Sequence, residues 1–230
     1  MARPLVLSDP VFSVPEVAAQ LRVNTARVRA MIAADLLDAA KVGKRWVVSA
    51  ASVERRQRSS FRAGRPLSPR RAWGLLLIAS GVRPAWLGPS DVSRLRGRLR
   101  ADRLRALVPR LRTRALVHSF RAHPSELRRL SPAVVLAGVS AASAYKVDLV
   151  PPNHLLDGYI RRKDLPKLLK RHTLEPSSRP NVVLRAVEGP WPFEQGATVA
   201  PVAVVAADLL ESDDARERRA GDQLLGRLAP

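Results

Sequence analysis

The chain has 230 residues, with 40 Lys and Arg against 20 Asp and Glu, and its formal net charge at pH 7 is +20. It has no cysteine, which excludes disulfides, thiolate zinc sites and a catalytic thiol. It also has no apolar run of 18 residues and no leader-like start, so we expect one to three cytoplasmic domains without membrane contact.

Two short helices joined by a tight turn are predicted in residues 13–33. Ser13 and Glu16 form an S-x-x-E capping box for the first helix. Its apolar stripe would consist of Val14, Val17, Ala18 and Leu21. Asn24 can cap the second helix, whose buried side would hold Val28, Met31 and Ile32. The opposite side carries small and basic side chains, namely Ala26, Ala30 and Ala33 flanked by Arg27 and Arg29.

A basic hairpin is predicted after the helices, in residues 41–48. Gly43 and Lys44 would form its turn, and Lys44 and Arg45 at the tip suit contact with phosphates or the minor groove. We expect Trp46 to pack the hairpin against the helices. The alternative for the whole region is a short helical hairpin with solvated arginines.

This order of elements resembles the winged helix-turn-helix of excisionases and MerR-like regulators, so residues 1–58 are expected to form a DNA-binding domain. In helix-turn-helix proteins the second helix usually enters the major groove. The resemblance implies that the reading residues are Asn24, Thr25, Arg27 and Arg29, and that the wing contacts are Lys44 and Arg45.

Residues 66–122 are expected to form a second, arginine-rich domain similar to a winged helix. Helices are predicted at 69–80 and from Ser90, followed by a hairpin of LRALVPRL and RALVHSFRA. Residues 61–130 have a net charge of +14, against +5 for residues 1–60 and +1 for residues 131–230. Such a segment favours a polyanion, with contacts from Arg94, Arg96, Arg98, Arg100, Arg112 and Arg114. The alternative is a solvated basic face that only keeps the protein soluble.

Residues 123–230 are expected to form a small α/β domain, which makes the chain an α+β, helix-rich multidomain protein. Strands are predicted at 155–160 and 181–187, and helices at 164–172, from Pro201 and from Ser212. The short strand before 139–144, the NVVLRAV strand and the Ala207–Leu210 helix before Asp214-x-Arg216 resemble the C-terminal domain of AbiEi-type antitoxins. That resemblance implies an antitoxin or operon regulator of a type IV system, paired with a nucleotidyltransferase-like toxin.

The sequence contains no recognisable catalytic or metal-binding signature. The histidines are scattered, and no nucleophile elbow, Walker A loop or dinucleotide-binding glycine motif occurs. His118 lies in a strand-like run of the predicted second wing. Glu211, Asp213 and Asp214 are expected to cap a helix rather than to bind magnesium. We therefore expect no enzymatic activity, no cofactor and no metal.

Together these features predict a sequence-specific transcriptional regulator at the nucleoid, the antitoxin and autorepressor of a type IV-like toxin–antitoxin system. Its partner would be double-stranded operator DNA, often with repeats, so that a homodimer could read two half-sites one helical turn apart. Three alternatives remain open: an excisionase-like factor that bends DNA for a recombinase, a protein that binds a toxin directly, and a nuclease.

Overall fold

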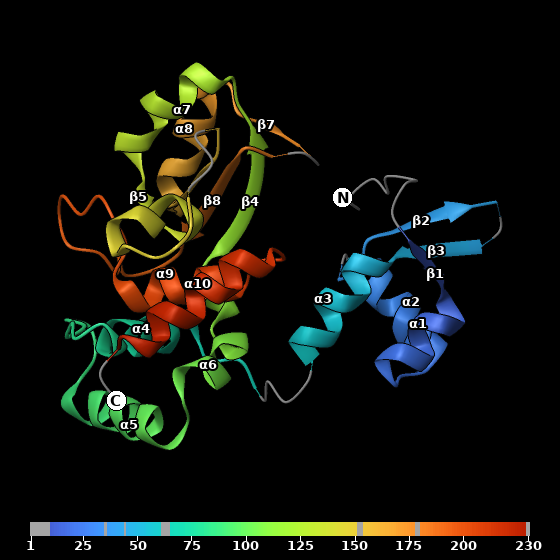
Figure 1. Cartoon of the computed structure of the whole chain (residues 1–230), viewed down its shortest axis with the longest axis horizontal. Helices are drawn as coiled ribbons and strands as arrows, with labels where there is room; N and C mark the ends of the chain where they lie inside the picture. The colour runs from blue at the N-terminus through green and yellow to red at the C-terminus, as the bar shows by residue number, and fades with distance from the viewer. Residues whose placement is uncertain are drawn as a thin grey trace. The chain divides into compact units, whose positions relative to one another are not determined.

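The chain folds into two compact units that divide after residue 63. The computed structural model describes residues 10–34, 36–43, 45–60, 65–150, 154–177 and 180–228. Figure 1 shows the helices and strands of each unit. No helix in these described ranges is long and apolar enough to cross a membrane.

The first unit consists of a helix pair, a three-stranded antiparallel sheet and a following helix (Figure 1). The helices are α1 (Val14–Leu21), α2 (Thr25–Ala33) and α3 (Ala50–Ser60). The strands are β1 (Val11–Ser13), β2 (Ala39–Val42) and β3 (Arg45–Ser49), in the order β1-β3-β2. The helix pair and the β2–β3 hairpin were predicted, whereas β1 was not, because three residues are too few to give a strand signal.

The core of the first unit forms where the helix pair meets β3 and α3. Val17, Val28, Val48 and Val53 are fully buried and come from α1, α2, β3 and α3 in turn. The predicted buried side of α2 is confirmed, because Met31 and Ile32 pack into the same cluster. The apolar stripes of α1 and α2 therefore pack into this core, so that one face of α2 is buried and its other face is exposed to solvent.

The second unit is built on a five-stranded mixed sheet in the order β5-β6-β8-β4-β7. The pair β6–β8 is parallel, and α8 (Leu165–His172) lies in the connection between these strands. The other pairs are antiparallel. The strands are β4 (Leu116–Arg121), β5 (Val135–Leu136), β6 (Leu156–Arg161), β7 (Glu175–Pro176) and β8 (Val182–Val187).

Helices cover both faces of this sheet. On one face, α7 (Pro124–Leu130) and α8 pack against alternate residues of β6 and β8, including Leu156, Ile160 and Leu184. The other face meets the larger core, which is formed with the 3-10 segment Gly138–Tyr145 and with α4 (Pro69–Ala79), α5 (Pro89–Ala101), α9 (Val202–Leu210) and α10 (Ala215–Gly226). Figure 1 shows α9 and α10 side by side, in agreement with their extensive contacts.

The predicted hairpin of the middle segment is not formed. LRALVPRL contains α6 (Leu104–Leu107) and then a 3-10 turn at Val108–Arg110, and a second 3-10 turn spans Arg112–Arg114. The run from Leu116 does form a strand, but β4 pairs with β8 and β7, which lie far along the chain. Residues 64–230 therefore form one unit, and the expected boundary at residue 122 does not divide it.

Two helix starts also differ from the expected ones by two residues. The N-cap of α5 is Gly88 rather than Ser90, because Pro89 occupies the first helical position. The N-cap of α10 is Asp214 rather than Ser212, since the Asp214 carboxylate accepts hydrogen bonds from the amides of Arg216 and Glu217. A carboxylate at this position also interacts favourably with the helix dipole.

Candidate nucleic-acid interface

The junction between α1 and α2 is fixed by hydrogen bonds that the sequence encodes. Ser13 and Glu16 close the capping box of α1, with 2.6 Å between the Ser13 amide nitrogen and Glu16 Oε2. At its other end Arg22 takes a left-handed conformation (φ 54°), and the Val23 amide donates to Ala18 O at 3.0 Å. Asn24 then caps α2, its Oδ1 accepting from the Arg27 amide at 2.7 Å. The turn is therefore tight and defined.

The outward face of α2 is small in the middle and basic at its flanks. Ala26, Ala30 and Ala33 are exposed, as predicted, and so are Arg27 and Arg29. Thr25, at the first position of the helix, is exposed too. Because alanine side chains are short, this face lets a helix axis approach a flat partner closely while the arginines reach out on both sides.

The hairpin after α2 has the expected turn. Gly43 has a positive φ of 59°, which glycine adopts without the steric cost that other residues incur. Arg45 is exposed and lies opposite Val42, whereas Lys44 lies outside the described residues. Trp46 lies opposite Lys41 and keeps 38% of its surface exposed, so it packs against the helices less than expected.

Most of the arginines singled out in the middle segment remain at the surface of the second unit. Arg96 and Arg100 on α5 are exposed, as is Arg112 in the turn before β4. Arg94 is exposed and lies 3.3 Å from Asp91. Arg98 is half-buried, with its Nε 3.8 Å from Asp102. These five side chains give α5 and its surroundings a basic face.

Arg114 is not part of that face, and the expectation that it contacts DNA is wrong. Its side chain is 2% exposed and donates to Asp208 Oδ1 at 2.6 Å and to both Glu211 oxygens at 2.7 and 2.8 Å. Burial alone would lower the pKa of Arg114, but Glu211, Tyr159 and Asp208 raise it well above its ordinary value. Arg114 therefore holds the turn before β4 to α9 from inside the unit.

A second buried pair adjoins the first. Arg185 on β8 donates from Nε and Nη2 to the two oxygens of Asp157 on β6, both at 2.9 Å. Its Nη1 is 3.6 Å from Asp208 Oδ1, which links the two pairs into one network. Burial raises the pKa of Asp157, although the charge of Arg185 acts in the opposite direction. Glu211 belongs to this network and is the C-cap of α9, so the expectation that it caps the start of the last helix, α10, is wrong.

This network was missed in the sequence, although the sequence does carry a signal for it. Each of Asp157, Arg185 and Asp208 interrupts an otherwise apolar strand or helix. A charged residue within a buried element is expected to have a partner of opposite charge, since burying it alone is very costly. The spacing along the chain does not reveal which residues pair.

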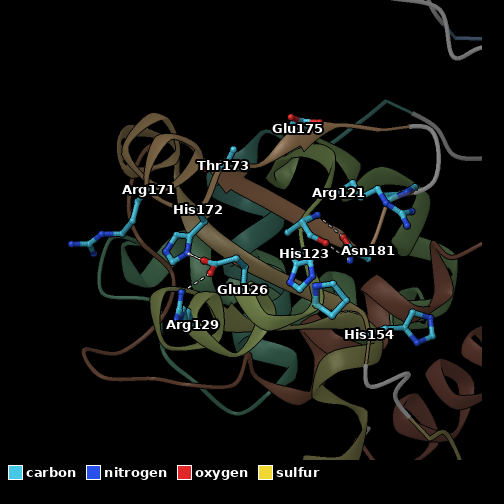
Figure 2. A pocket seen from close by; sticks show the side chains of 13 residues that line it. Arg121, His123, Glu126, Arg129, His154, Arg171, His172, Thr173, Glu175 and Asn181 are labelled. Carbon is cyan, nitrogen blue, oxygen red and sulfur yellow. Dashed lines mark hydrogen bonds and ion pairs between the residues drawn. The ribbon is translucent and has the colours of Figure 1, made fainter.

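A cavity of about 870 Å³ lies at the end of the second unit where α7 and α8 meet β4 and β7. Figure 2 shows Glu126 of α7 between His172 of α8 and Arg129. Its Oε2 lies 2.9 Å from His172 Nδ1, and its Oε1 lies 2.8 Å from Arg129 Nη1. The hydrogen bond from His172 is the main cause that lowers the pKa of Glu126. Asn181 exchanges two hydrogen bonds of 2.8 Å with the backbone of Ala122. These contacts join neighbouring elements, and the described residues contain no group of three potential metal ligands.

Comparisons with known families agree with both parts of this architecture. A model described as a helix-turn-helix domain matches residues 11–60, which cover all of the described part of the first unit except Pro10. A second model, described as "Transcriptional regulator, AbiEi antitoxin, Type IV TA system", matches residues 100–227, more than half of the chain. No curated protein and no solved structure matches the chain. The chain therefore belongs to the AbiEi antitoxin family, the DNA-binding transcriptional regulators of type IV toxin–antitoxin systems.

Proposed function

We propose that this protein represses its own operon by binding the operator through α2 and the β2–β3 wing. Its operon partner would be a nucleotidyltransferase-like toxin. The observation that carries the proposal is the outward face of α2, where exposed Arg27 and Arg29 flank three exposed alanines in the region that the helix-turn-helix model matches.

In this mechanism α2 lies in the major groove and its arginines read base edges. A guanidinium can donate two parallel hydrogen bonds to the O6 and N7 atoms of guanine, which no other base accepts in the same way. Asn24 uses its oxygen to cap the helix, so its amide group remains to donate to a phosphate. Thr25 and the start of α2 would bind a phosphate of the same DNA strand, because helix N-termini favour anions.

The wing would grip the backbone beside the groove that α2 reads. Arg45 is exposed at the end of the β2–β3 turn, and Lys44 completes the basic tip in the sequence. Contacts of this kind fix the orientation of the protein on the duplex without carrying sequence information. Two protomers bound as a homodimer to repeated half-sites, one helical turn apart, would raise the specificity.

The second unit would add affinity that does not depend on sequence. The side chains concerned are those of the α5 face and the turn before β4, namely Arg94, Arg96, Arg98, Arg100 and Arg112. With about 6–10 phosphate contacts in total, affinity should fall by about 10³–10⁵ between 50 and 200 mM salt.

The proposal is tested with the double variant Arg27→Ala, Arg29→Ala and two duplexes, the protein's own promoter region and a scrambled sequence of equal composition. We expect each lost base contact to cost about 1–3 kcal/mol of discrimination. The ratio of the two dissociation constants should therefore fall at least about tenfold, as measured by fluorescence anisotropy at constant salt.

The matched control is Arg83→Ala, Lys167→Ala, which removes the same charge from exposed positions of the second unit. It should lower both affinities and leave their ratio unchanged. Equal promoter preference in the Arg27, Arg29 variant and in the unmodified protein would show that α2 does not read the operator.

A further inference from the structure

A second hollow, of about 650 Å³, lies where α4 begins, and arginines dominate its walls. Arg65, Arg71, Arg98 and Arg110 line it together with Leu67, Ser68 and Thr113. None of the described residues that line it is acidic. A hollow that gathers four permanent positive charges without a carboxylate in its wall has the composition of an anion site.

Hydrogen bonds to backbone carbonyl groups hold the walls of this hollow in place. The Leu67 amide donates to Arg110 O at 2.9 Å, and Thr113 Oγ1 donates to Leu67 O at 2.6 Å. Arg110 Nε donates to Arg65 O at 3.0 Å, which ties the start of the unit to the turn after α6. The segment before α4 and the turns before β4 therefore form a preformed frame, which lowers the entropic cost of binding a ligand.

The positive charge of this hollow is only partly offset by the protein. Asp91 lies 3.6 Å from Arg71, but it also pairs with Arg94 at 3.3 Å. Asp102 lies 3.8 Å from Arg98, whose buried Nε has no hydrogen-bond partner among the described residues. Neither Arg65 nor Arg110 has an ion pair within the described part of the chain. Mutual repulsion of these guanidinium groups would be relieved by a bound anion.

The first turn of α4 adds a second source of positive potential. The helix has 11 residues, and Ser68 precedes it as an N-cap whose side chain makes no capping hydrogen bond. Pro69 has no amide hydrogen and the Arg71 amide donates to Ser68 O at 3.0 Å, so the Arg70 amide and the Ser68 hydroxyl are the groups left at the edge of a hollow that Ser68 and Pro69 line. Arginine forks and helix N-termini both favour tetrahedral oxyanions.

We propose that this hollow binds a phosphate group. A DNA backbone phosphodiester and a free phosphorylated molecule share this chemistry, and the position of Arg98 on the basic α5 face favours DNA. The proposal rests on the proposed function only for the source of the phosphate, because phosphate binding here does not require that α2 reads an operator.

The test uses the full-length, ¹⁵N-labelled protein and pyrophosphate as the probe, at constant ionic strength. We expect saturable shifts of the backbone amides of Arg70 and Arg71 and of the Arg98 Nε resonance. The variant Arg65→Gln, Arg71→Gln should lose these shifts or weaken the apparent Kd at least about tenfold. The control Lys167→Gln, Lys170→Gln, which removes two exposed charges from α8, should retain them.

A second arm distinguishes the source of the phosphate. If backbone DNA occupies the hollow, saturating duplex should abolish the pyrophosphate shifts, and the Arg65, Arg71 variant should lower the salt slope of DNA binding by about 0.9 per lost contact. If the shifts persist with DNA bound, a free phosphorylated molecule is the ligand. Absent shifts, or shifts equal in both variants, would overturn the proposal, whereas failure of operator recognition by α2 would leave these readouts unchanged.

Discussion

Arg114 shows how little the local sequence says about where one arginine side chain lies. It belongs to an Arg-Thr-Arg run in the most basic part of the chain, and Arg112, two residues earlier, is exposed. What buries Arg114 is a pair of carboxylates, Asp208 and Glu211, almost a hundred residues later in the chain. The composition could predict a basic surface, but it could not show which arginine is buried.

At this scale we predict that Arg114→Ala destabilises the second unit by about 3–5 kcal/mol, because it removes the guanidinium that bridges the carboxylates of Asp208 and Glu211 inside the protein. Arg112→Ala should change stability by no more than about 0.5 kcal/mol, since its side chain is exposed. Urea unfolding followed by circular dichroism measures both. If Arg114→Ala leaves the unfolding midpoint unchanged and lowers DNA affinity instead, the buried network does not exist in solution.

Among the elements, those with local start signals were the most predictable. The capping box of α1, the Asn24 cap of α2 and the apolar spacing of both helices were read from adjacent residues and are confirmed. By contrast, β4 was recognised as a strand but assigned the wrong partner, because a strand sequence does not specify which distant strand it will pair with. For the same reason the sequence did not show that α4 and α5 contribute to the larger core.

The capping box gives a pH prediction for the first unit. Hydrogen bonds from the Ser13 amide and then from its hydroxyl lower the pKa of Glu16 in the folded state. The stabilisation by Glu16 is therefore complete above the pKa of the unfolded chain, and it disappears as the pH falls through the lowered pKa of the folded state. Glu16→Gln should destabilise the unit at pH 7 and match the unmodified protein at the acidic end.

Urea unfolding between pH 2.5 and about 7 measures this difference, and the matched control is Gln20→Ala at an exposed position later in α1. A constant offset between Glu16→Gln and the unmodified protein over the whole range would show that the Glu16 carboxylate does not act through its charge.

On the scale of the whole molecule, charge and fold divide the chain at different places. The sequence shows +14 in residues 61–130 and almost no net charge after residue 130. The structure joins both stretches in one compact unit, so the unit that contains the AbiEi-like residues 100–227 also has a basic side built from α5 and its neighbours. Composition could locate the charge, but only long-range packing determines which domain carries it.

This arrangement predicts that specificity and affinity can be separated by mutation. Arg94→Gln, Arg96→Gln and Arg100→Gln combined should lower the slope of log K against log salt by up to about 2.7, at about 0.9 per lost phosphate contact. Promoter preference over scrambled DNA should stay the same. An unchanged slope would show that the α5 face is merely solvated, and a lost preference would place sequence reading in the second unit.

The partly exposed indole of Trp46 has a practical consequence. It is the only tryptophan in residues 1–63, whereas Trp73 is almost completely enclosed in the aromatic cluster of the second unit, 5.1 Å from Tyr159. Solvated indoles emit at longer wavelengths than enclosed ones, so the red edge of the fluorescence spectrum reports on the wing once the half-buried Trp86 and Trp191 of the second unit are replaced by phenylalanine. The protein thus carries its own optical probe of the surface that is proposed to meet the operator, without any attached dye.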